Sequence, residues 1–120
     1  EKSFLKKDNV SEVIVPAFEG ELGILKDHIS IISFLKPGII KIFIGNEEEK
    51  FYIEDGIVEF KDNCLSILTS SIFDIKNFDK DIISNSISEA EKELLGDKID
   101  DQKRFLLNHK VEVLKSLNTN

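Results

Sequence analysis

The chain has 120 residues, one cysteine and a formal net charge of −7 at pH 7. Hydrophobic residues make up 41% and charged residues 32% of it, which is typical of one globular domain, or a small domain with an appendage. The acidic balance argues against nucleic-acid binding and against charge-driven adhesion to an anionic membrane. We see no secretory signal, and no apolar run reaches the roughly 20 residues of a membrane-spanning helix. Cys64 cannot form an internal disulfide, which favours a reducing compartment.

The first 78 residues contain short β-branched and apolar runs separated by turn residues. We expect Pro16 to end the first strand, the acidic residues 47–49 to form a loop, and Asp55-Gly56 to join two strands as a hairpin. Strands spaced by roughly 8–12 residues favour an all-β sandwich or flattened barrel. The predicted strands are 12–15, 29–35, 39–44, 51–53, 57–60, 64–68 and 72–75.

From Asp79 the spacing of apolar residues changes to that of a helix. Asp79 and Asp81 place negative charge where a helix begins, and Gly96 is typical of a helix end. A second helix is expected at about 100–117, and the short connection makes the two helices antiparallel. The first helix is acidic and the second mildly basic, which favours charge pairing between them over docking on an acidic partner.

The sequence therefore predicts two domains. Residues 1–78 form the β-sandwich domain, and residues 79–120 form a C-terminal α-helical antiparallel hairpin.

Glu19 and Glu21 form the most obvious pair of carboxylates. On one strand their Cβ atoms would be about 6.5–7 Å apart, a spacing that suits glycoside hydrolysis. However, Gly20 and Gly23 indicate a turn, and the chain has no Trp and one Tyr for stacking on a sugar. Solvent-facing or partner-facing acids are therefore the favoured interpretation.

Other chemistry finds little support in the sequence. His28, His109 and Cys64 are far apart, and they lack the paired spacing of metal ligands. Phosphate-binding loops, dinucleotide fingerprints and nucleophile elbows are absent from the sequence. We therefore predict no catalytic residue, metal or cofactor, and a binding or regulatory role.

Residues 15–28 read Val-Pro-Ala-Phe-Glu-Gly-Glu-Leu-Gly-Ile-Leu-Lys-Asp-His. This segment closely resembles a signature of the epsilon subunit of F-type ATP synthases, whose mitochondrial counterpart is called delta. Three further segments follow in the family's order: 35–40 resembles L-K-P-G-x-[IV], 55–59 resembles G-G-x-x-E, and 63–68 resembles N-x-V-x-[IV]-L. The resemblance covers residues 10–78 well, whereas the helical half matches only in position and period.

The resemblance implies a non-catalytic subunit of the rotary central stalk. Such a subunit binds gamma and the c-ring, and helps to couple proton-driven rotation to ATP synthesis. It lies peripherally at the cytoplasmic face of the bacterial plasma membrane, without inserting into it. The helical hairpin would reach the catalytic alpha/beta head and, as in bacterial relatives, restrain ATP hydrolysis.

The resemblance also implies a partner-binding site. The acidic turn matches the family region that meets the polar loops of the c-ring, Glu21 matches its best-known contact acid, and a histidine follows the turn. For both glycines of the turn, a backbone role and a partner role remain open. The site residues, for the c-ring or gamma, are Glu19, Gly20, Glu21, Gly23 and His28.

The chain departs from the family pattern in three places. ATP-binding members of the family carry the motif [IL]-D-x-x-R-A, whereas residues 78–83 of this chain read Phe-Asp-Lys-Asp-Ile-Ile. Ile82 therefore stands where the family has an arginine whose guanidinium binds phosphate. We expect ATP binding to be weak or absent. Lys26-Asp27 stands where the family has Pro-Gly or Gly, and one more family strand is expected ahead of Glu1. Two functions remain as alternatives to the stalk subunit: a nucleotide-sensing regulatory module, and an unrelated ligand-binding β-sandwich enzyme.

Overall fold

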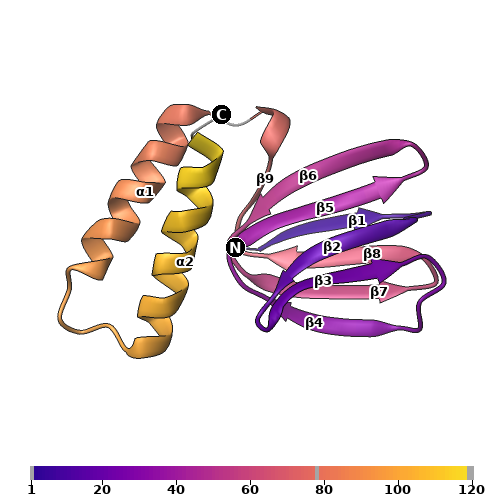
Figure 1. The fold of residues 1–120 in the computed structure, drawn as a ribbon, viewed down its shortest axis with the longest axis horizontal. Helices are drawn as coiled ribbons and strands as arrows, with labels where there is room; N and C mark the ends of the chain where they lie inside the picture. Colours follow the sequence, from indigo (N-terminus) through magenta and orange to yellow (C-terminus); the bar gives the residue numbers. More distant parts are fainter. Residues whose placement is uncertain (1, 78, 119–120) are drawn as a thin grey trace. The chain divides into compact units, whose positions relative to one another are not determined.

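The structure is a computed structural model that describes residues 2–77 and 79–118. The chain divides into two compact units, Glu1–Lys76 and Asn77–Asn120. Within the described residues, nine strands precede two helices (Figure 1). The strands are β1 (Ser3–Lys7), β2 (Glu12–Ala17), β3 (Gly20–Leu25), β4 (Ile31–Leu35), β5 (Gly38–Ile44), β6 (Glu47–Ile53), β7 (Gly56–Lys61), β8 (Cys64–Thr69) and β9 (Ile72–Asp74).

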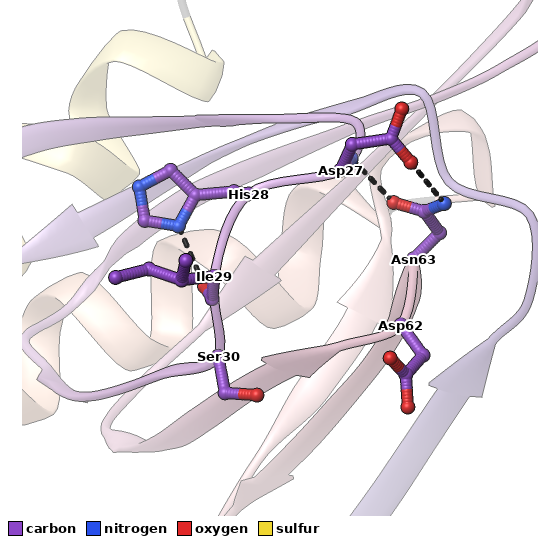
Figure 2. Close-up of a pocket in the computed structure, with 6 residues that line it drawn as sticks. All are labelled: Asp27, His28, Ile29, Ser30, Asp62 and Asn63. Carbon is purple, nitrogen blue, oxygen red and sulfur yellow. Dashed lines mark hydrogen bonds between the residues drawn. The ribbon is translucent and has the colours of Figure 1, made fainter.

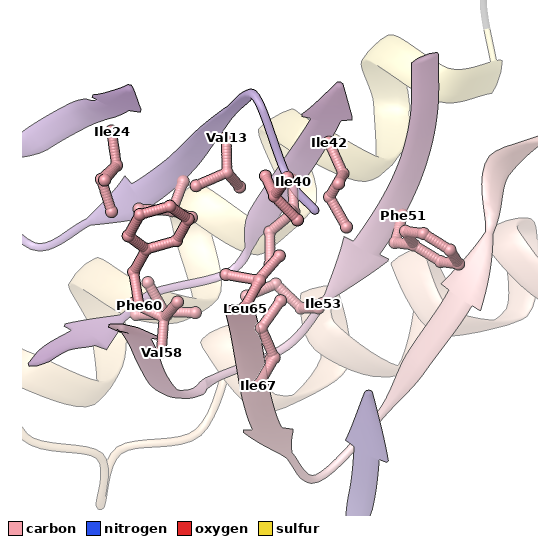
Figure 3. Packing of buried hydrophobic residues seen from close by; sticks show 13 residues of the cluster. Val13, Ile24, Ile40, Ile42, Phe51, Ile53, Val58, Phe60, Leu65 and Ile67 are labelled. Carbon is pink, nitrogen blue, oxygen red and sulfur yellow. The ribbon is translucent and has the colours of Figure 1, made fainter. Parts of the chain in front are cut away.

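The strands pair antiparallel in the order β1-β8-β7-β4-β2-β5-β6-β9, and β3 lies beside β2. β1, at one end of this order, comes close to β6, the last strand but one at the other end: Lys7 on β1 forms an ion pair with Glu49 on β6, with a Nζ–Oε1 distance of 3.2 Å. The sheet thus curls into a flattened, nearly closed barrel. Alternate residues point inward and form one apolar core that includes Val13, Phe60 and Ile67 (Figure 3). The predicted sandwich or flattened barrel of the N-terminal domain is confirmed.

The expectation that Pro16 ends the first strand is wrong. Pro16 lies inside β2, opposite Glu21 of β3. The second edge of β2 pairs with β5 only at residues 12–14 and with β4 only at Ala17. A proline, which lacks an N–H, is tolerated at such an unpaired position, and its carbonyl still accepts a hydrogen bond of 3.0 Å from the Lys36 amide.

The expectation that the acidic residues 47–49 form a loop is also wrong. Residues 47–49 are the first residues of β6, where Glu47 pairs with Ile44 of β5. The connection is the two-residue turn Gly45-Asn46, with a positive φ of 61° at Gly45. The turn residues therefore outweigh the strand-disfavouring charge of the three glutamates.

Asp55-Gly56 does not form the predicted hairpin. β6 pairs with β5 and β9, whereas β7 pairs with β4 and β8. Asp55 instead accepts hydrogen bonds from the Ser70 amide at 2.8 Å and the Thr69 hydroxyl at 3.3 Å. These bonds join the connection between β6 and β7 to the end of β8 and the connection that follows it. In addition, the sequence analysis assigns no strand before residue 12, where the structure has β1.

The second unit contains α1 (Lys80–Leu94) and α2 (Asp101–Asn118), which pack as a helical hairpin. The predicted start is confirmed, since the Asp79 carboxylate accepts a 2.8 Å hydrogen bond from the Asp81 amide as the N-cap. Ion pairs between the helices join Glu93 to Lys103 at 3.1 Å and Glu91 to Lys115 at 3.3 Å, as the charge pattern favoured. Phe78 lies outside the described residues. No helix in the described part of the chain is long and apolar enough to cross a membrane.

Candidate partner-binding surfaces

The acidic turn lies at the tip of the β2–β3 hairpin. Phe18 and Glu19 form the two-residue connection between Ala17 and Gly20, which face each other across the pair of strands. Glu19 and Glu21 are both exposed. The turn therefore presents two carboxylates to solvent from a hydrogen-bonded scaffold.

The two glycines of this turn differ in what the backbone demands of them. Gly20 has φ of +132°, a conformation that residues with a Cβ rarely adopt, so the turn itself requires glycine. Gly23 has no such φ, and a Cβ built on it would meet nothing within 4 Å. The fold of this chain thus leaves the glycine at position 23 unexplained, whereas it accounts for Gly20.

His28 lies at the other end of β3, in the loop that follows the strand. β3 has six residues, a length of about 17 Å at the usual rise of a strand. The structure therefore does not bring His28 beside Glu19 and Gly20. Its Nδ1 lies 2.7 Å from the Ile29 carbonyl oxygen, and the side chain is exposed.

His28 is one of six residues that line a polar hollow of about 550 Å³ (Figure 2). The Asp27 amide donates to Asn63 Oδ1 at 2.7 Å, and Asn63 Nδ2 donates to Asp27 Oδ1 at 3.0 Å, which joins two loops 36 residues apart in sequence. Asp27 has φ of +65°. The turn thus keeps the left-handed backbone that suits the family's glycine, because Asp tolerates that region better than most residues.

Among the described residues, including those that line this hollow, no three His, Cys, Asp or Glu side chains are grouped so that they could hold a metal ion. Cys64 also lacks the character of a nucleophile. A hydrogen bond with Asp8, helped by burial and by that carboxylate's charge, raises the pKa of the Cys64 thiol. The surfaces that remain are suited to binding.

The sequence analysis missed an exposed apolar surface on the outside of the barrel, which we call the apolar face. One row of directly opposed residues crosses four neighbouring strands, from β1 through β8 and β7 to β4. Ile32 and Phe18 extend the row into two adjoining grooves of about 240 and 530 Å³. The members of the row are Phe4 (63% exposed), Leu68 (41%), Ile57 (40%) and Phe34 (65%).

One signal in the sequence could have found this face. β4 reads Ile-Ile-Ser-Phe-Leu, so it is apolar on both of its faces. A strand of an antiparallel sheet with one solvated face normally alternates apolar and polar residues. Apolar residues on the outward face therefore indicate that another surface covers it.

Together, the acidic turn and the apolar face on a rigid β-barrel define an interaction protein. Residues 1–75 match the family model described as the beta-sandwich domain of the delta/epsilon chain of ATP synthase. The chain therefore belongs to the ATP synthase delta/epsilon family, as its sequence motifs indicated.

Individual relatives agree with this assignment. The chain is 64% identical over 118 residues to the ATP synthase epsilon chain of Pelagibacter ubique strain HTCC1062, covering 98% of this chain and 91% of that one. It is 36% identical over 91 residues to the epsilon chain of Leptospira interrogans serovar copenhageni, covering 76% and 72%. It is 31% identical over 84 residues to the mitochondrial delta subunit of Eremothecium gossypii, covering 69% and 53%.

Solved structures show the same fold. The chain is similar to one in the Euglena gracilis mitochondrial ATP synthase, with a TM-score of 0.65 and 21% identity, covering 92% of this chain and 69% of that one. A chain of the Tetrahymena thermophila central stalk and c-ring gives a TM-score of 0.56 at 17% identity, covering 93% and 84%. With the family assignment, the predicted role as a non-catalytic central-stalk subunit of ATP synthase is confirmed.

Proposed function

We propose that this subunit binds gamma through its apolar face and the c-ring through its acidic turn. In this way it couples proton-driven rotation to ATP synthesis, as a peripheral subunit at the cytoplasmic face of the bacterial plasma membrane. The observation that carries the proposal is the row of exposed apolar residues across four paired strands.

The apolar face is suited to a permanent partner. Contiguous exposed apolar surface on a folded protein marks an interaction site, because covering it removes that surface from water. The strands hold the side chains of the row in one register, so little backbone entropy is lost when a partner binds. The central shaft of the rotor is the partner that a stalk subunit must grip firmly, and we therefore assign the face to gamma.

The acidic turn is suited to a different contact. The exposed carboxylates of Glu19 and Glu21 attract basic or polar loops, and such contacts give orientation more than affinity. Gly23 follows on the same exposed side of β3, and its missing side chain lets another backbone approach. We assign Glu19, Gly20, Glu21 and Gly23 to the c-ring. His28, at the far end of β3, we assign to gamma.

A binding measurement tests the assignment of the apolar face. Phe34→Ser removes a ring that is 65% exposed, so the barrel is expected to fold normally. Its affinity for gamma in the assembled head is expected to fall at least tenfold, which corresponds to about 1.4 kcal/mol. Glu48→Ser, at an exposed residue of β6 outside the apolar face, is the control and should bind as the natural chain does. Unchanged affinity of Phe34→Ser would refute the proposal.

The acidic turn needs its own experiment. In reconstituted synthase, Glu21→Gln is expected to weaken the coupling between proton flow and ATP synthesis while leaving the affinity for gamma unchanged. Glu48→Gln on β6 serves as the control, because Glu48 is exposed and lies in register with Glu12, at the end of β2 opposite the turn. Full coupling in Glu21→Gln would argue against the c-ring assignment.

We further propose that the helical hairpin contacts the alpha/beta head and restrains ATP hydrolysis. Assembled enzyme whose copy of this subunit lacks residues 79–120 should hydrolyse ATP faster than the complete enzyme. An identical rate would show that the hairpin exerts no restraint.

A further inference from the structure

A single carboxylate interrupts the apolar face. Glu59 on β7 lies directly between Ile32 on β4 and Ser66 on β8, two residues along β7 from Ile57 of the apolar row and on the same face. It lines the 240 Å³ groove together with Ile32 and Ser66, and its side chain is exposed. Any partner that covers the apolar row therefore also covers Glu59.

Within the described part of the chain, the Glu59 carboxylate has no partner. None of residues 2–77 and 79–118 forms a hydrogen bond or ion pair with the Glu59 carboxylate. Lys6 stands on the same row but two strands away, opposite Ser66, at roughly 10 Å from the strand spacing. Lys61 follows two residues along β7, with its Cα about 7 Å away. In the free subunit, water solvates the charge of Glu59.

Binding of a partner to the apolar face changes the solvation of Glu59. When a partner seals the apolar face, the carboxylate loses its water, and an ionised group buried without a counter-charge opposes association. A basic group on the partner removes this penalty and forms a hydrogen-bonded pair in a water-poor setting. The lone acid also rejects partners or registers that bring an apolar or acidic group to this point.

We propose that gamma presents a lysine or arginine side chain to Glu59, and that this pair fixes the register in which the apolar face docks. The proposal rests on the assignment of the apolar face to gamma. A second copy of this chain is a poorer occupant, because each copy carries a formal net charge of −7.

The test measures affinity for gamma in the assembled head, using the full chain at low and at high salt. Glu59→Gln keeps the size of the side chain and removes its charge, so affinity at low salt should fall at least tenfold. Glu59→Lys brings like charges together and should weaken binding at least a hundredfold. Glu48→Gln and Glu48→Lys, on the exposed part of β6, are matched controls expected to stay within about twofold.

Salt and rescue separate a specific pair from a general loss of charge. The Glu59 variants should show a weaker salt dependence of the association rate than the natural chain. In addition, one Lys→Glu or Arg→Glu substitution in gamma should restore the binding of Glu59→Lys, which would identify the partner residue.

The outcomes distinguish failure of this inference from failure of the proposed function. If Phe34→Ser weakens binding but Glu59→Gln does not, the apolar face is the docking site and the ion pair is refuted. If neither substitution matters, the assignment of the face to gamma fails, and the pair fails with it. A dimer of the subunit alone that Glu59→Lys disrupts would place a second copy on the face and would also overturn the inference.

Discussion

Gly56 is the position where one added methyl group should disturb the barrel most. It begins β7 with φ of +138°, a conformation that is strained for any L-residue with a side chain. A Cβ built there would overlap the backbone carbonyl oxygen of Leu68 and lie 3.2 Å from the Thr69 Cβ. Since these neighbours are mostly strand backbone, β7 or β8 must move to accept an alanine.

The expected cost of Gly56→Ala follows from these two effects. A non-glycine residue in this region costs about 1–3 kcal/mol, and moving packed backbone costs about 1–3 kcal/mol more. The barrel should therefore lose about 2–6 kcal/mol of unfolding free energy. For a domain of this size, even the lower value lowers the melting temperature by about 8–16 °C. Leu68 belongs to the apolar face, so affinity for gamma should fall as well.

Thermal unfolding measures the loss of stability, and amide hydrogen exchange in β7 and β8 shows whether the loss lies in the barrel itself. Gly23→Ala is the matched control, because Gly23 has no positive φ and open space where the Cβ would stand. It should change stability by less than about 1 kcal/mol, in the stabilising direction, because alanine restricts the unfolded chain more than glycine does. If Gly56→Ala unfolds at the same temperature as the natural chain, the reasoning from φ and backbone overlap is wrong.

Three further predictions concern polar contacts. Asn63→Ala removes both hydrogen bonds to Asp27, and denaturant unfolding should show a loss of about 1–2 kcal/mol, while a midpoint that does not move would contradict a locking role. Asp79→Ala removes the N-cap of α1 and should lower hairpin stability by about 1 kcal/mol, measured by helical circular dichroism during melting. Burial opposes ionisation of Asp55, but hydrogen bonds from Ser70 and Thr69 outweigh it and lower the pKa of that carboxyl. The stability advantage over Asp55→Asn should therefore be complete above the ordinary Asp pKa of about 3.9 and decline as the pH falls through the lower folded pKa. An advantage that grows on acidification would refute this assignment.

Local sequence predicted the elements of this fold better than their pairing. The helix over α1 followed from apolar periodicity and from Asp79, because both the stripe and the cap depend on residues within a few positions. Pro16, the three glutamates of β6 and Asp55-Gly56 were misread for one shared reason. Each depends on which strand lies alongside, and strand pairing is decided by contacts between residues far apart in sequence.

In the candidate site too, local features were predicted correctly, whereas features that depend on strand pairing were not. The carboxylates of the acidic turn were identified correctly as exposed because turn and charge are local features. His28 was grouped with them because the family motif has a histidine beside the turn, although an extended strand separates the two ends. The apolar face escaped notice because Phe4, Phe34 and Leu68 become neighbours only when four strands adopt their register.

The contrast between Gly20 and Gly23 links the fold to the proposed function. Gly20 is required by its backbone conformation, so a substitution there would disturb both the turn and any partner contact, and the two effects could not be separated. Gly23 carries no such requirement, and its position on the exposed side of β3 leaves room that the chain itself does not use. A side chain at position 23 would therefore perturb only what lies outside the barrel, and a loss of coupling in a normally stable Gly23→Ala subunit would support the proposed contact with the c-ring.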